Sequence, residues 1–279
     1  MDKISCSLSL MRRLPPNKIE QSLSGLLNLL PDETDELLQR VDQPLEECHD
    51  PDSGRTFLLC DYNRDGDSYR SPWSNKYFPP LDDGFLPSEK LRTMEMEANE
   101  LFDSYRELYF EGGTSSVYLW DLGDGFAGCF LIKKNVENNR FVNSGSWDSI
   151  HVVEAVNTAP NKATYKLTTT VMLSMSVAKE QVGNTNMSGS LTRQVESSCT
   201  LDNAENTHLA NIGRLIEEQE SDMRSNLNEL YILKTREIVN SIRTNADGPI
   251  QSASHVAHLN AAVTGHGKSR KVDSETEGA

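Results

Sequence analysis

The chain has 279 residues, 42 acidic and 27 basic, so its formal net charge at pH 7 is −15. This balance argues against nucleic acid or an anionic membrane surface as a partner, because phosphate binding needs clustered Lys and Arg. No run reaches the roughly 18 apolar residues that predict a membrane span, and the first residues show no secretory signal. We therefore expect a cytoplasmic protein without a membrane span.

Residues 1–43 predict three short helices, because apolar residues recur at helical spacing in three stretches. Pro15 and Pro16 end the first stretch, Pro31 the second and Pro44 the third. Such short connections are typical of antiparallel neighbours. We expect a three-helix stalk in this part of the chain.

Residues 44–113 predict a strand, an irregular loop and a helix. The strand covers Thr56–Cys60, and a loop rich in Asp, Asn, Pro and aromatic residues follows it. Ser88 is a plausible N-cap for a helix that runs to about Phe110, with apolar residues along one side. The Glu111–Gly113 segment then ends the helix.

Residues 114–200 predict antiparallel strands. Their expected ranges are Ser115–Leu122, Phe126–Lys134, Ser146–Ala155, Lys162–Val177 and Ser190–Ser197. The Asp121–Gly125 segment predicts a hairpin turn, and residues 180–190 predict a polar loop. Strands in a run, followed by a helix, indicate an α+β fold with an antiparallel sheet.

The longest helical pattern covers residues 207–243, within a segment that we delimit as 205–243. Such a helix would be about 55 Å long, so we expect it to cross a wide sheet or to reach a second subunit. Residues 244–279 form the C-terminal segment, with a weaker helix over Ser252–Thr264. There Val256, Leu259 and Val263 form a narrow apolar stripe.

Several motifs for metal, phosphate or catalysis are incomplete. Asp61–Asp67 imitates half of an EF-hand loop, but Pro72 stands where the bidentate Glu is needed. Gly267–Ser269 lacks the earlier glycine of a phosphate-binding loop. The five cysteines are widely spaced without a Cys-x-x-Cys motif, which predicts reduced thiols. We expect no catalytic residues, no metal site and no cofactor.

The segment CDYNRD matches a family signature, formed by Cys60, Asp61, Tyr62, Asn63, Arg64 and Asp65. The match continues as GDSYRSPWSNKY and includes MRRLPP, VDQPL, YFEGG, SSVYLWDL, GFAG, SWDSIHVVE, YKLT, GSLTRQ and ANIGRL, in order, from residue 1 to about 243. The sequence thus resembles the β subunit of the heterodimeric F-actin capping protein family.

The resemblance implies a three-helix stalk, a five-stranded antiparallel sheet crossed by a long helix, and a mobile amphipathic C-terminal "tentacle". It also implies an obligate heterodimer with a capping protein α subunit. That heterodimer would block the barbed ends of actin filaments, without calcium and without catalysis, as part of the cytoskeleton.

The resemblance also implies site residues. The family's basic actin-facing position on the long helix falls on Arg224, while a nearby family Lys is replaced by Asp222. Lys133 and Lys134 are further candidates, although ordinary solvated charge is the simpler interpretation of them. The apolar face of the tentacle, formed by Val256, Leu259 and Val263, would enter a hydrophobic cleft of actin.

Two alternatives and one further partner class remain open. The chain would serve equally as a structural subunit of an actin-like filament assembly such as dynactin. A calcium-regulated severing protein is disfavoured by Pro72. Asp42 and Asp83 match acidic positions open to regulators that carry a basic capping-protein-interaction motif, although solvated turn acids are the simpler interpretation.

Overall fold

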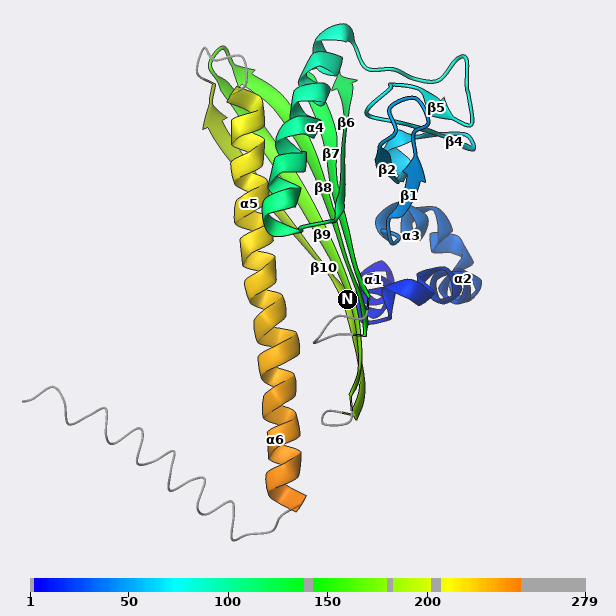
Figure 1. The fold of residues 1–279 in the computed structure, drawn as a ribbon, viewed down its shortest axis with the longest axis vertical. Helices are drawn as coiled ribbons and strands as arrows, with labels where there is room; N and C mark the ends of the chain where they lie inside the picture. Colours follow the sequence, from blue (N-terminus) through cyan, green and yellow to red (C-terminus); the bar gives the residue numbers. More distant parts are fainter. Residues whose placement is uncertain (1–2, 138–142, 180–182, 202–206, 247–279) are drawn as a thin grey trace, which may run out of the picture. The chain divides into compact units, whose positions relative to one another are not determined.

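The computed structural model describes residues 3–137, 143–179, 183–201 and 207–246. The chain divides into two compact units, Met1–Met223 and Arg224–Ala279. The first unit holds an α+β fold built on one five-stranded antiparallel sheet in the order β10-β9-β8-β7-β6 (Figure 1). Its strands are β6 (Thr114–Leu122), β7 (Gly125–Glu137), β8 (Ser144–Ala159), β9 (Lys162–Lys179) and β10 (Gly183–Thr200).

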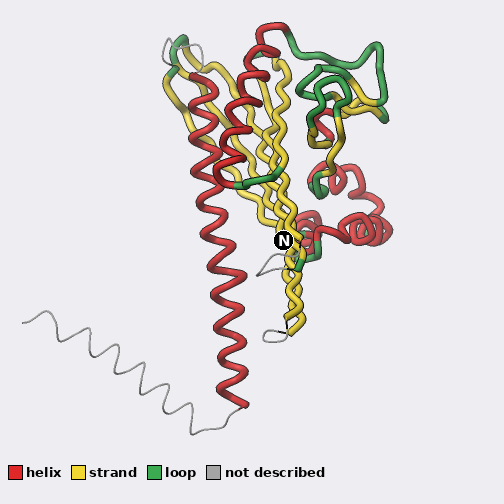
Figure 2. The backbone as a smooth tube through the Cα atoms, in the orientation of Figure 1, coloured by secondary structure: helices red, strands yellow, loops and turns green. Residues whose placement is uncertain are grey.

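Helices cover one face of this sheet, and smaller elements cover the other (Figure 2). On one face lie α4 (Glu89–Tyr109) and α5 (Thr207–Leu227). The other face carries α1 (Lys3–Met11), α2 (Ile19–Leu29), α3 (Thr34–Arg40) and two small sheets. Those sheets consist of β1 (Glu46–His49) with β2 (Thr56–Leu59), and of β3 (Arg64–Asp65), β4 (Ser68–Arg70) and β5 (Tyr77–Phe78).

The central strands separate two apolar cores, because alternate side chains of a strand point to opposite faces. On the helical face, Phe130 and Ile132 of β7 pack in a cluster with residues of α4 and α5. On the other face, Cys129 and Leu131 of the same strand pack with Leu58 of β2. A third cluster holds the three N-terminal helices together, with Leu37 fully buried at its centre.

The expected three-helix stalk, antiparallel sheet and long helix are confirmed, but some boundaries differ. β10 begins at Gly183, inside the segment expected to be a polar loop, because its ladder with β9 continues from Ser190↔Met172 to Gly183↔Lys179. Ser88 does precede α4, yet its hydroxyl donates to Asp121 at 2.8 Å instead of capping the helix. Gly112, at φ 69°, follows the helix in the left-handed region that favours glycine.

The long helical pattern is interrupted within the second unit. Residues Asn228–Leu233 form a π-helical segment, and α6 (Lys234–Ala246) continues from it. In α6 the apolar residues Ile238, Val239 and Ile242 are exposed. The expected helix over Ser252–Thr264, and with it the tentacle, lies outside the described residues. None of the described helices is long and apolar enough to cross a membrane.

Candidate functional site

The signature loop, residues 60–77, is held by the buried side chain of Asn63. The Asn63 Oδ1 atom accepts a hydrogen bond from the backbone N–H of Cys60 at 2.9 Å. Its Nδ2 group donates to the carbonyl oxygens of Leu58 at 3.3 Å and Arg70 at 2.9 Å. One amide thus ties the end of β2 to β4. The half-EF-hand pattern is therefore used for folding the loop, since Asn63 points into the protein.

Asp50, also buried, anchors the far side of the loop. Its Oδ2 atom accepts from the Ser71 hydroxyl at 2.6 Å and from the Ser74 N–H at 3.2 Å. Burial by itself raises the pKa of Asp50, but hydrogen bonds from Ser71, Ser74, Ser53 and the Asp52 N–H outweigh it and hold the pKa well below its usual range. The carboxylate is therefore a structural acceptor with its bonds already used.

Arg70 connects the loop to α4 through a buried ion-pair network. Its guanidinium makes two hydrogen bonds of 2.7 Å to the carboxylate of Glu95, whose side chain is 0% exposed. Arg92 adds a second ion pair to Glu95. The same carboxylate accepts the backbone N–H of Leu119 in β6 at 2.7 Å. Three elements of the chain, β4, α4 and β6, therefore meet at one negative charge.

A polar cavity of about 520 Å³ lies between the 41–46 segment and the signature loop. Asp42, Asp61, Tyr62 and Cys60 are among its lining residues. Burial raises the pKa of Asp42, with a smaller contribution from Asp61, although Thr170 and Arg12 oppose the shift. The ring of Tyr62 stacks on Trp120 with centroids 5.3 Å apart. The cavity thus combines acidic groups with an exposed aromatic face, a combination suited to a basic side chain.

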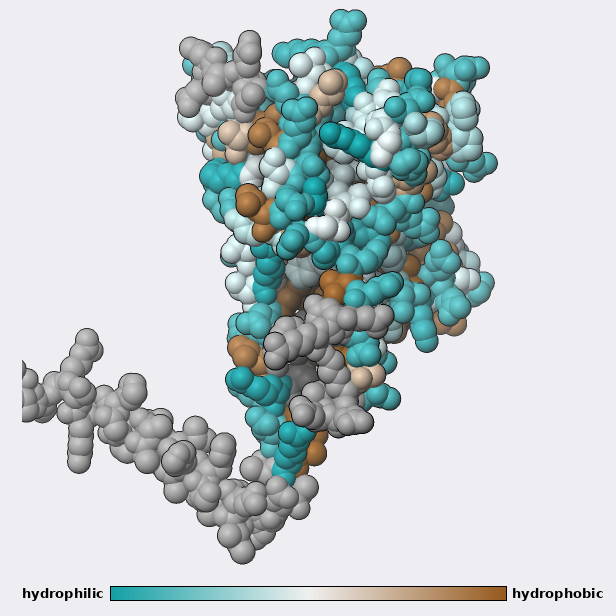
Figure 3. Space-filling view, viewed as in Figure 1, coloured by the Kyte–Doolittle hydropathy of each residue, from teal (hydrophilic) through white to brown (hydrophobic). Residues whose placement is uncertain are grey.

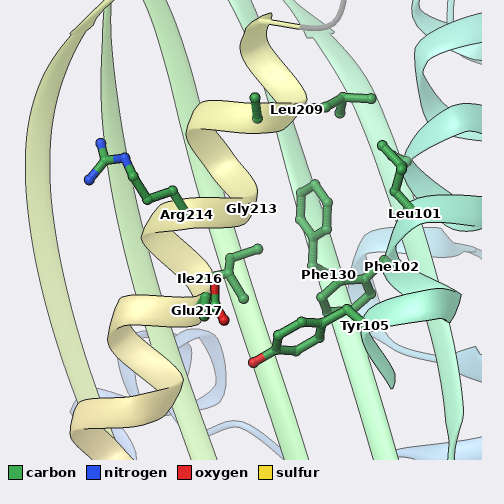
Figure 4. Close-up of a pocket in the computed structure, with 11 residues that line it drawn as sticks. Leu101, Phe102, Tyr105, Phe130, Leu209, Gly213, Arg214, Ile216 and Glu217 are labelled. Carbon is green, nitrogen blue, oxygen red and sulfur yellow. The ribbon is translucent and has the colours of Figure 1, made fainter. Parts of the chain in front are cut away.

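An apolar groove of about 400 Å³ runs between α4 and α5 on the helical face (Figure 4). Figure 4 shows Leu101, Phe102 and Tyr105 of α4 on one side, α5 on the other and Phe130 of the sheet as the floor. Leu101 is 57% exposed. The space-filling view shows brown patches interrupting the mainly hydrophilic surface over these two helices (Figure 3). This groove is typical of a surface that receives a protein partner.

Beneath α5 a buried histidine meets a buried glutamate. The Nε2 atom of His151 in β8 lies 3.1 Å from Oε1 of Glu220, and its Nδ1 atom lies 3.0 Å from the Thr169 hydroxyl. Both the His151 and Glu220 side chains are 0% exposed. This buried pair couples α5 to β8 of the sheet, because each group provides a polar partner for the other.

The three cations expected to face actin differ in their exposure and in their partners. Lys133 is only 13% exposed and forms an ion pair of 3.0 Å with the buried Asp148. Lys134 donates to the carbonyl oxygen of Glu111, in the turn after α4. Arg224 is half-buried in α5. The three cations thus lie on two strand positions and one helix.

The two residues expected to bind regulators also differ in exposure and position. Asp42 is half-buried beside the polar cavity, whereas Asp83 lies exposed in the loop before α4. The stripe of Val256, Leu259 and Val263 lies outside the described residues. Sequence reasoning missed Arg70, Glu95, His151 and Glu220, because their partners lie far away in the chain and no local motif marks them.

Among the described residues, the structure combines an apolar groove, a sheet edge formed by β10 and an acidic cavity. Within the described ranges, no cluster of His, Cys, Asp and Glu is arranged to hold a metal ion. The family model described as "F-actin capping protein, beta subunit" matches residues 4–239. The chain belongs to this family.

Three similar proteins are named F-actin-capping protein subunit beta. The Drosophila melanogaster protein is 53% identical over 243 residues, covering 87% of each chain. The Caenorhabditis elegans protein is 54% identical over 243 residues, covering 87% of this chain and 89% of its own. The Dictyostelium discoideum protein is 53% identical over 248 residues, covering 88% and 90%.

A solved structure shares the fold at low sequence identity. It is the homodimeric actin capping protein alpha subunit from Plasmodium berghei, which aligns with a TM-score of 0.53 and 17% identity. The alignment covers 87% of this chain and 96% of that one. At this identity the likeness concerns the fold alone.

Proposed function

We propose that this chain is the β subunit of a heterodimer that caps the barbed ends of actin filaments, independently of calcium, and blocks both addition and loss of subunits. The observation that carries the proposal is the family match over residues 4–239, together with relatives above 50% identity that are named for capping F-actin. The mechanism is steric occlusion in the cytoplasmic cytoskeleton and requires no catalytic group or cofactor.

The open edge of the sheet supports a heterodimer. β10 is an edge strand of 18 residues, and within the described sheet it pairs only with β9. A long edge strand with free backbone groups is a template for pairing with another chain. We propose that a capping protein α subunit covers this edge and continues the sheet. The solved capping protein alpha subunit shares the fold of this chain, and two subunits of similar fold can form a pseudo-symmetric pair.

The apolar surface on the helical side supports the same assembly. The groove between α4 and α5 and the exposed Leu101 and Leu108 leave apolar area in water. Permanent heterodimers bury large hydrophobic surfaces of this kind. We propose that the α subunit covers this groove. Produced alone, the chain is then expected to aggregate, whereas co-expression with an α subunit is expected to yield soluble protein.

For contact with actin we propose Arg224 as the main cation of this chain. Lys133 and Lys134 remain candidates, but their ammonium groups already bind Asp148 and the Glu111 carbonyl. Arg224→Ala is therefore expected to accelerate dissociation from barbed ends about 3- to 10-fold, the effect of losing about 1 kcal/mol. Asp222→Asn, two residues away on the same helix, is the matched control. An unchanged off-rate for Arg224→Ala would remove this residue from the interface.

The acidic cavity is our proposed site for regulators with a basic interaction motif. Asp42 and Asp61 line it, and Asp83 lies in the loop before α4. A basic, extended peptide would find carboxylates for its Lys and Arg side chains and the Tyr62 ring for stacking.

Elongation from actin seeds tests the main proposal. Pyrene-actin elongation is measured with the co-expressed heterodimer in calcium and in chelator. Complete block of barbed-end growth in both conditions is expected. Filament shortening only in calcium would point to severing instead. Stable binding to an actin-like filament without any block of growth would favour the structural subunit.

The tentacle is tested by deleting residues 250–279 from the co-expressed heterodimer. Val256, Leu259 and Val263 would each contribute about 1.5–3 kcal/mol to the binding free energy when buried in an actin cleft, before the cost of ordering the segment. We expect the barbed-end off-rate to rise at least 10-fold after the deletion. The matched control replaces only these three residues by Ser and should reproduce most of the effect. Equal off-rates for the deletion and the full chain would refute a capping role for the segment.

A further inference from the structure

Two cysteine side chains meet beneath the signature loop. Cys129 lies in β7 and is directly opposite Tyr118 in the ladder with β6. The Tyr118 hydroxyl donates to the carbonyl oxygen of Leu58 at 2.7 Å. Leu58 precedes Cys60 by two residues and packs in the same apolar cluster as Cys129, so this buried bond keeps the end of β2 close to Cys129.

The two thiols share one cluster and interact directly. Cys60 packs against the apolar cluster that contains Cys129, Tyr118 and Leu58. Burial raises the pKa of the Cys129 thiol, and the hydrogen bond with Cys60 makes the second largest contribution in the same direction. Both cysteines are free in this structure. The fold therefore brings together two sulfur atoms that lie 69 positions apart in the sequence.

The two thiols differ in access. Cys60 is half-buried and lines the polar cavity of about 520 Å³, so a small oxidant can reach it from solvent. Cys129 is 0% exposed. Cys60 is thus the group that reacts first, and Cys129 is placed to resolve the product.

We propose that Cys60 and Cys129 form an intramolecular disulfide when the protein meets hydrogen peroxide. The Cys60 thiolate attacks one peroxide oxygen and the O–O bond breaks, which leaves a Cys60 sulfenic acid and hydroxide. The Cys129 sulfur then attacks the Cys60 sulfur, the S–O bond breaks, and water leaves with the thiol proton. In total, two thiols lose two electrons to one peroxide, which becomes two molecules of water.

The bond would fasten the signature loop to a central strand of the sheet. It would also move the cavity wall that Cys60 forms, beside Asp42 and Tyr62. The other cysteines lie elsewhere, Cys6 on α1, Cys48 on β1 and Cys199 on β10. The proposed modification is therefore specific to one pair.

Peptide mapping under non-reducing conditions tests the proposal on the protein purified with its co-expressed partner. After graded hydrogen peroxide and alkylation, we expect a linked pair of peptides carrying Cys60 and Cys129, lighter by two hydrogens and released by dithiothreitol. Cys60→Ser should abolish the link. Cys48→Ser is the matched control, because Cys48 is also half-buried near β2, and it should leave the link intact.

The order of reaction gives a second readout. In Cys129→Ser, or in Cys129→Ala if the serine variant does not fold, peroxide should leave Cys60 as a sulfenic acid that dimedone traps. The proposal is wrong if both cysteines stay fully alkylatable at peroxide levels that oxidise Cys6. It is equally wrong if wild-type Cys60 proceeds to sulfinic acid without ever forming the link.

Discussion

Glu95→Ala is expected to lower the thermal unfolding midpoint of the co-expressed protein by roughly 10 °C, the largest effect of any single substitution proposed for this chain. The Glu95 side chain is 0% exposed and forms ion pairs with Arg70 and Arg92. The Arg70 side chain is only 5% exposed. Removing one partner of a buried ion pair costs about 3–5 kcal/mol, because the remaining charge cannot return to water. The buried Leu119 N–H would lose its acceptor as well.

A control variant separates the effect of breaking the ion-pair network from the effect of removing one negative charge. Glu100→Gln is the control, since Glu100 is an exposed residue on the same helix and its substitution removes the same charge. It should shift the midpoint by less than about 2 °C. Arg70→Met combined with Glu95→Leu should recover part of the loss, because an apolar pair often replaces a buried ion pair at little cost. A Glu95→Ala midpoint equal to that of Glu100→Gln would contradict the role assigned to the network.

His151→Leu is expected to destabilise the protein by about 3 kcal/mol, because it leaves the Glu220 carboxylate buried without the imidazole. The two groups lie 3.1 Å apart, and each side chain is 0% exposed. Glu220→Leu alone should cost a similar amount, since His151 then faces an apolar side chain. The expected readout is a fall in the urea midpoint with an unchanged m-value.

A double-mutant cycle measures the coupling of this pair. The variant with both His151→Leu and Glu220→Leu should be more stable than either single variant, which corresponds to an interaction energy of about 3 kcal/mol or more. Asp222→Asn serves as the control on the same helix, because Asp222 is exposed. Strict additivity of the two single losses would show that helix and sheet are not coupled through this pair.

Local sequence patterns predicted much of this fold. The prolines after each apolar stretch marked the three N-terminal helices, and the period-two alternation marked the main strands. The patterns failed where a partner strand, not the local sequence, decides the structure. Gly183–Ser188 contains Gly, Asn and Ser and resembles a loop, yet the ladder with β9 holds it as a strand. The strand β1 was missed for the same reason, since its charged residues pair only with β2.

The candidate site was less predictable than the fold. Lys133 looked like a solvated strand residue, but its neighbour across the ladder is Asp148, which is buried and pairs with it. Arg70 and Glu95 are 25 positions apart, so only the three-dimensional fold brings them together. The signature CDYNRD pointed to the right loop, whereas the role of Asn63 as its internal anchor follows only from the contacts of its side chain.

Strand β7 has one further consequence, because it supplies alternate side chains to two separate cores. Phe130 and Ile132 belong to the helical side, while Cys129 and Leu131 belong to the opposite side. A point substitution in β7 therefore damages one core and spares the other. A deletion of a single residue, in contrast, exchanges the two faces for the rest of the strand. In β7 we therefore expect a substitution to be tolerated far better than the deletion of a residue.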